Sequence, residues 1–236
     1  MSQQSLIDRV AERVGMPIHP NLEFLDQNGA EGLEWYLNEK ILQAATTGEA
    51  KDHTRVLKYA YNFCLNGARV TFVQEGTGKT PDLEFTINGL ALYMEVKKLR
   101  ISAANPSKHL VEKVVSAVEN KRLQLPEDQI GFVAIDNFDL NVESVPDQGF
   151  TYEHLLDGLS EVDRLAHENP SGWRPSGVIL ATHTSGGVSP PSPLSIPHFI
   201  WANECAEPKA PASLVGFIRS SLPDGKIFQP EAARRL

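Results

Sequence analysis

The sequence predicts an α/β protein with a mixed central sheet flanked by helices. Helical periodicity alternates with short strand-like runs along the 236 residues. The pair Asn88-Gly89 is the strongest short signal for a β-hairpin, because a tight hairpin turn needs positive φ at both central positions. The apolar runs 130–136 and 177–184 are typical of buried strands. The length fits one large domain, or one domain with an additional lobe.

The first half of the chain is predicted to be helical and then to form three strands. Apolar side chains at helical spacing place helices over 5–14, about 31–45 and about 52–65. Asn66-Gly67 ends the third helix, since glycine favours the left-handed cap position. The predicted strands are 68–74, 81–85 and 91–97, with a loop over 75–80.

The second half alternates again between helices and strands. Helices are predicted over 108–125 and 151–167, each with an apolar stripe. Strands are predicted over 130–136, 177–184 and 198–204, with loops over 137–150 and 185–197. The segment 212–222 is compatible with either a helix or a strand. From 52 to 136 the expected order is helix, three strands, helix, strand.

Composition points to a folded protein without a membrane span. The hydrophobic fraction is 41% and the charged fraction 22%, and no apolar run reaches bilayer-spanning length. The N-terminus lacks the basic start and apolar run of a secretion signal. The two cysteines give no disulfide framework, and Cys64 is expected to be a small buried side chain. A cytoplasmic location is therefore expected.

Charge is unevenly distributed along the chain. The net charge of −8 argues against non-specific coating of nucleic acid. Segment 96–125, however, carries seven Lys and Arg against two Glu. This basic segment directly follows the predicted hairpin and could contact a phosphate backbone. A solvated helix face is an equally good interpretation of the charges alone.

The Asn88-Gly89 turn fixes which side chains share a face of the hairpin. Ile87 is expected opposite Leu90, and the pairs continue outward from there by strand register. The apolar face consists of three cross-strand pairs, namely Ile87 with Leu90, Phe85 with Leu92, and Leu83 with Met94. The other face pairs Thr86 with Ala91, Glu84 with Tyr93, and Asp82 with Glu95.

The pair Asp82 and Glu95 has a chemical rather than a structural rationale. Directly opposed residues have Cβ atoms about 4.5–5.5 Å apart, so two carboxylates there repel each other. A divalent cation between them reverses that interaction. Lys97 lies on the same face of its strand, and the carbonyl of Val96 could add a ligand. Carboxylates with retained waters and phosphate oxygens are the environment that Mg²⁺ favours.

Pro81-Asp82, twelve intervening residues, and Glu95-Val96-Lys97 together resemble the signature of the PD-(D/E)xK nuclease superfamily. The resemblance implies a restriction-endonuclease-like αβββαβ core, with Asp82 and Glu95 binding Mg²⁺, for which Mn²⁺ could substitute. Lys97 would orient or help deprotonate the attacking water. The resemblance covers about 52–136 only. We expect an N-terminal helical segment packed on the core (1–48), the nuclease-like core (49–136), and a C-terminal extension of the same domain (137–236).

The chain departs from the family pattern at one position. Many members carry an acidic residue on the helix before the first strand, and its expected place near Arg55 holds none. Glu49 or Asp52 could substitute. The residues expected to bind nucleic acid are Lys79, Lys98, Arg100, Lys108, His109 and Lys113.

The expected function is Mg²⁺-dependent phosphodiester hydrolysis, with DNA ranked before RNA as substrate. Cleavage of both strands of a duplex would favour a homodimer. One alternative is a catalytically inactive scaffold of the same fold that binds nucleic acid or protein. Another is an enzyme whose site lies among the C-terminal strands near His183, which ends an apolar strand.

Overall fold

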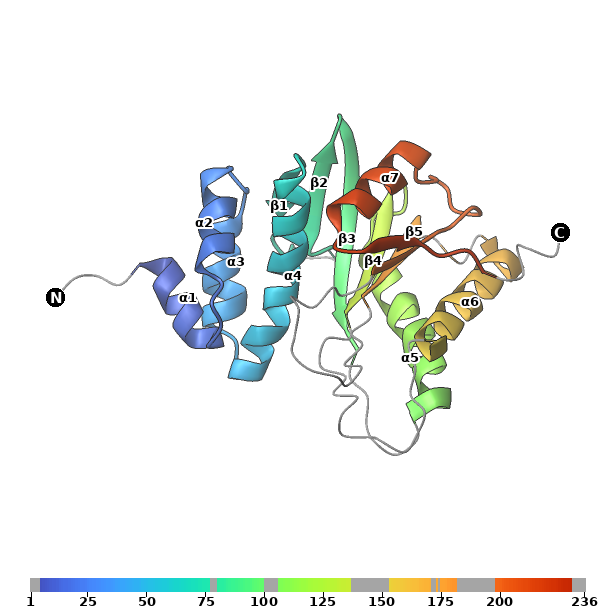
Figure 1. The fold of residues 1–236 in the computed structure, drawn as a ribbon, viewed down its shortest axis with the longest axis horizontal. Coiled ribbons are helices and arrows are strands. Elements are labelled where there is room, and N and C mark those ends of the chain that lie inside the picture. The colour runs from blue at the N-terminus through green and yellow to red at the C-terminus, as the bar shows by residue number, and fades with distance from the viewer. Residues whose placement is uncertain are drawn as a thin grey trace. The chain divides into compact units, whose positions relative to one another are not determined.

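The computed structural model describes residues 5–76, 80–99, 106–136, 153–170, 173, 175–181 and 198–230 (Figure 1). It is a mixed α/β structure. The helices are α1 (Leu6–Val14), α2 (His19–Gln27), α3 (Leu33–Tyr36), the π-helix η1 (Leu37–Leu42), α4 (Thr47–Leu65), α5 (Pro106–Lys121), the 3₁₀ turn η2 (Arg122–Gln124), α6 (Glu153–Glu168) and α7 (Ala212–Ser221). The strands are β1 (Arg69–Phe72), β2 (Leu83–Ile87), β3 (Leu90–Lys98), β4 (Gly131–Asp136), β5 (Gly177–Ala181), β6 (His198–Ala202) and β7 (Gly225–Ile227).

The strands form a mixed sheet with the order β1-β2-β3-β4-β5-β6-β7. Pairing is antiparallel for β1 with β2, β2 with β3, and β5 with β6, and parallel for β4 with β5 and β6 with β7. The chain divides into two compact units, Met1–Met94 and Glu95–Leu236. None of the helices in the described ranges combines the length and apolarity needed to cross a bilayer.

In the first unit, helix α1 begins where the sequence predicts. The Ser5 hydroxyl accepts from the backbone N–H of Asp8, and the Asp8 carboxylate accepts from Ser5 in return, which completes a capping box. Helix α4 lies against the hairpin, with the rings of Phe63 and Phe85 stacked at a centroid distance of 4.5 Å. This contact buries the apolar face of β2.

The helix predicted over 31–45 is wrong in its first part. The backbone N–H of Glu31 donates to the carbonyl of Val70 (2.9 Å), and the Glu31 carbonyl accepts from Phe72 (2.8 Å), so residue 31 pairs with β1. Gly32 follows with φ +74°, and a Cβ there would lie 2.6 Å from the Phe72 carbonyl oxygen. Pairing with a strand edge, which periodicity does not show, therefore delays the helix until Leu33.

One further helix was not predicted, and another begins earlier than predicted. Helix α2 was not predicted, because only Leu22 and Leu25 are buried on it and give a weak periodic signal. The helix predicted from 52 begins at Thr47 instead. Thr46 caps it by accepting from the backbone N–H of Glu49 (3.1 Å), and this Thr-x-x-Glu start accounts for the earlier beginning.

The hairpin register is confirmed from the turn outward. Asn88 and Gly89 have φ values of 50° and 82°, as a type I′ turn requires. All five predicted pairs from Ile87 with Leu90 to Leu83 with Met94 are present. The next pair in the series, Asp82 with Glu95, stays a prediction. Cys64 is only partly buried rather than buried, and partial burial raises the pKa of its thiol.

In the second unit, β4 and β5 are buried along their whole length, as the apolar runs predict. Helices α5 and α6 lie side by side (Figure 1). Gly158 of α6 permits this approach, because a Cβ there would lie 2.7 Å from the Cβ of Val114. The predicted helix 108–125 is divided into α5 and η2. The predicted loops 137–150 and 185–197 lie outside the described residues.

The C-terminal part of the second unit contains a helix where the sequence allowed a helix or a strand, and a strand that was not predicted. Segment 212–222 forms a helix, α7, which buries Leu214 and Ile218 four residues apart. Strand β7 was not predicted, because three residues with two exposed side chains carry no readable alternation. It pairs in parallel with β6 through Ile200 and Ile227.

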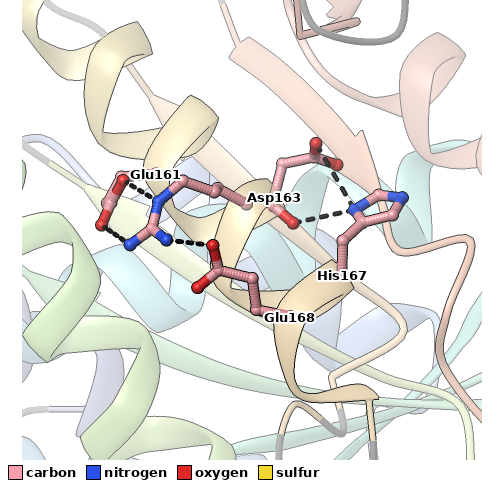
Figure 2. Close-up of polar contacts among 5 residues, drawn as sticks. Glu161, Asp163, His167 and Glu168 are labelled. Atoms are coloured by element: carbon pink, nitrogen blue, oxygen red, sulfur yellow. Dashed lines mark hydrogen bonds and ion pairs between the residues drawn. The ribbon is translucent and has the colours of Figure 1, made fainter. Parts of the chain in front are cut away.

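Asp163 of α6 anchors the helix to the sheet and provides a stability test. Figure 2 shows Asp163 with His167, its neighbour on the same helix. The Asp163 carboxylate accepts a 2.8 Å hydrogen bond from the indole N–H of Trp201, which is buried on β6. Asp163→Ala leaves that donor without its acceptor, so we expect the free energy of unfolding to fall by about 1–3 kcal/mol in urea denaturation. Glu168→Ala, which removes only an exposed ion pair with Arg164 on the same helix, is the control and should unfold like wild type. Equal midpoints for the two variants would contradict the anchoring role.

Candidate metal and nucleic-acid site

Asp82 lies at the entrance to β2 in the first unit. Its carbonyl accepts from the backbone N–H of Val73 (3.1 Å). This hydrogen bond continues the β1–β2 pairing by one residue beyond Phe72 and Leu83. The Asp82 side chain is half-buried. Burial lowers the pKa of His53, a residue of α4, and the negative charge of Asp82 opposes that shift.

Several charged residues of the first unit affect the pKa of His53. Burial lowers its pKa, the negative charges of Asp82, Glu49 and Asp52 oppose that shift, and the Lys40 ammonium adds to it. The candidate third acids and Asp82 therefore act on one histidine. This is the arrangement expected if an acid on α4 contributes to the same site as Asp82.

The two candidate third acids differ in their other contacts. The Glu49 carboxylate accepts from the backbone N–H of Ala45 (2.9 Å), the residue before the N-cap of α4. Asp52 is half-buried one helical turn further along the chain. Both acids stay candidates. Arg55, near the position where the family pattern places an acid, is buried.

His53 is also held by an aromatic neighbour. The phenol oxygen of Tyr36 lies 3.2 Å from Nδ1 of His53 and also donates to the His53 carbonyl (3.3 Å). The two rings meet edge to face. These contacts fix the imidazole against α3. Sequence reasoning did not select Tyr36 or His53, although His53 directly follows a candidate acid.

Glu95 is a buried carboxylate in the second unit, with 1% of its surface exposed. The ammonium of Lys121, the last residue of α5, contacts its Oε1. The Gln124 amide faces both carboxylate oxygens. Because a carboxylate can only accept, we assign the amide nitrogen to this side, from which it donates to both oxygens (2.8 and 3.1 Å). An ionised carboxylate needs such compensation when it is removed from water. Neither partner was predicted, since nothing in the sequence separates Lys121 from the other basic residues of the segment.

The residues after Glu95 on β3 alternate in exposure. Val96 is half-buried, Lys97 exposed and Lys98 half-buried. Residues 95 and 97 of one strand point to the same face. The backbone N–H of Leu99 donates to the carbonyl of Asp136 (2.9 Å), which ties the end of β3 to the end of β4.

Of the predicted nucleic-acid-binding residues, the structure describes few. Lys113 is half-buried on α5, and Lys98 is half-buried on β3. Lys79, Arg100 and the side chains of Lys108 and His109 lie outside the described residues. For these positions the prediction stays a prediction.

The C-terminal strands hold a second buried polar pair. Asp136 of β4 and His198 of β6 are both directly opposite Ala181 of β5, so the three residues share a face of the sheet. Both polar side chains are buried. Nδ1 of His198 lies 2.9 Å from the carbonyl of Pro223. His183, which prompted the alternative site, lies outside the described residues.

The donor atoms suit a hard cation. Carboxylate and carbonyl oxygens are the ligands of Mg²⁺, which retains several waters and usually takes only one or two carboxylates. Among the described residues, no group of three or more His, Cys, Asp or Glu side chains is arranged to hold a metal ion. Comparisons with protein-family models, with curated proteins and with solved structures find no match.

Proposed function

We propose that the protein is a Mg²⁺-dependent nuclease of the PD-(D/E)xK type that hydrolyses phosphodiester bonds in DNA, with RNA as the second candidate. The observation that supports this best is Glu95, a buried carboxylate on β3. Lys97 follows two residues later on the same face of the strand and is exposed. A structural role alone does not account for this carboxylate, because a buried ion pair such as Glu95 with Lys121 generally stabilises a fold no better than apolar residues of the same volume. The confirmed β2–β3 register and the element order from α4 to β4 are compatible with a restriction-endonuclease-like core.

Each residue would have a distinct role. Asp82, Glu95 and the carbonyl of Val96 would hold Mg²⁺, with Glu49 or Asp52 as a further acid on α4. When bound, the ion supplies positive charge that polarises the phosphoryl group. The exposed ammonium of Lys97 orients the attacking water and neutralises charge on the scissile phosphate.

The basic segment after β3 would guide the nucleic-acid backbone. Lys98 and Lys113 are the described members of this group, and Lys79, Arg100, Lys108 and His109 complete it in the proposal. Phosphate contacts from such residues position a strand without reading its sequence. Cutting a duplex on both strands would favour a homodimer. A cytoplasmic location would give access to this substrate.

The test is cleavage of labelled single- and double-stranded DNA and RNA. We expect the wild type to cut in Mg²⁺ or Mn²⁺ and to stop when EDTA is added. Lys97→Met should slow cleavage by about 10²–10³-fold, because it removes a charge from the transition state. Lys209→Met is the matched control, since Lys209 is exposed and lies at 4.0 Å from the exposed Glu204. Cleavage that persists in EDTA, or that is unchanged by Lys97→Met, would contradict the proposal.

One observation favours a second candidate function. Lys121 already supplies the positive charge that Glu95 needs, so the buried carboxylate is compensated within the protein. The same fold could then be a scaffold that binds nucleic acid or protein without cutting it. Nucleic-acid binding that survives Asp82→Asn and Glu95→Gln, with no cleavage by wild type in any metal, would select this function.

A further inference from the structure

Lys121 and Gln124 are partners of Glu95 that differ in charge, and both belong to the second unit. Lys121 brings an ammonium to Oε1 from the end of α5. Gln124, in the turn that follows, brings a neutral amide that donates to both oxygens. The amide can remain in place whether or not a cation is present, whereas the ammonium and a cation would repel each other at the same oxygen.

The exposure of the two side chains shows which partner can leave. The Glu95 side chain is 2% exposed and fixed within the strand, whereas the Lys121 side chain is 20% exposed at the end of its helix. Lysine has a long flexible stem that can return its ammonium to water while the stem stays packed. Glutamate on a buried strand has no such freedom. Displacement of Lys121 is therefore the route by which a metal could gain access to Glu95.

We propose that Lys121 is the internal counter-ion of Glu95 in the metal-free protein and that Mg²⁺ must displace it to bind. This inference rests on the proposed function, because it assigns a competitor to the same metal site. Gln124 is the positioning residue that keeps the carboxylate oriented during the exchange. The metal-free fold is thereby protected from an uncompensated buried charge, and the affinity for metal is reduced by the fraction of molecules in which Lys121 occupies Glu95.

The test compares Mn²⁺ binding by calorimetry in wild type, Lys121→Met and Lys121→Arg. Met keeps the length of the stem without the charge, so Lys121→Met should bind Mn²⁺ about tenfold or more tightly than wild type. It should also melt at a lower temperature without metal and gain more from added Mn²⁺. Lys121→Arg keeps the cation and should resemble wild type. Lys209→Met, which removes an exposed lysine in the same unit, should change neither quantity.

A second measurement does not depend on whether Lys121→Met folds. Chemical shifts of the lysine side chains in the wild-type protein, with Lys121 assigned by its loss in Lys121→Arg, should show the Lys121 ammonium moving to solvent values as Mg²⁺ is added. Equal Mn²⁺ affinities in wild type and Lys121→Met, or an unchanged Lys121 signal at saturating Mg²⁺, would overturn the inference. If wild type still cuts DNA in that case, the proposed function stands without it. If neither protein binds Mn²⁺ and wild type does not cut, both proposals fail.

Discussion

Asp82→Asn and Glu95→Gln are each expected to reduce Mg²⁺-dependent cleavage by about 10³-fold or more, since each removes a charge on which the transition state depends. Both substitutions keep the size and shape of the side chain. The loss should therefore appear in the cleavage rate and not in the circular dichroism spectrum. Initial rates on one DNA substrate, measured at several Mg²⁺ concentrations, would show whether the lost rate returns at high metal.

The control for this pair is Glu204→Gln, an equal change of charge on an exposed side chain of the second unit. It should cut at the wild-type rate. Either Asp82→Asn or Glu95→Gln cutting at the rate of this control would remove that carboxylate from the proposed site. Loss of activity in only one of the two would point to a site that does not use the pair.

Stability separates the two substitutions even where activity does not. Asp82→Asn removes a carboxylate that, in the predicted pairing, repels Glu95 when no metal is bound, so the melting temperature should be unchanged or higher. Glu95→Gln leaves the Lys121 ammonium facing a neutral amide, so the melting temperature should fall. Opposite changes in melting temperature together with the same loss of cleavage would distinguish a shared chemical role from a general loss of fold.

The hairpin was predictable because its register follows from local rules. Asn88-Gly89 fixes the turn, and strict alternation then assigns every pair up to Leu83 with Met94. The buried strands β4 and β5 were predictable for the same reason, since an uninterrupted apolar run has few other places to go. Both predictions use only neighbours in sequence.

Features that depend on distant partners were not predictable. Glu31 joins β1 through backbone groups, which carry no side-chain signal. Lys121 meets Glu95 across 26 residues, and composition does not distinguish it from the other lysines of the basic segment. The contact of the Glu49 carboxylate with the backbone of Ala45 was likewise not predictable, because it follows from where α4 begins. The sequence indicates candidate acids, whereas their partners come from tertiary packing.

Gly177→Ala is expected to destabilise the second unit by about 3 kcal/mol, the upper part of the range for overpacking a core. Gly177 opens β5 between Phe132 of β4 and Ala202 of β6. A Cβ there would lie 2.3 Å from the Phe132 ring and 2.4 Å from the backbone carbonyl of Trp201. The ring is fully buried, and the carbonyl belongs to a paired strand, so neither can move away cheaply.

Gly216→Ala is the matched control, because Gly216 lies within α7 and a Cβ there would meet no atom within 4 Å. Alanine is favoured over glycine in a helix interior, so this variant should gain up to about 1 kcal/mol. In urea denaturation, the midpoint of Gly177→Ala should be lower than that of wild type, and the midpoint of Gly216→Ala should be higher. A Gly177→Ala midpoint at or above the wild-type value would mean that β4, β5 and β6 separate more easily than their contacts indicate.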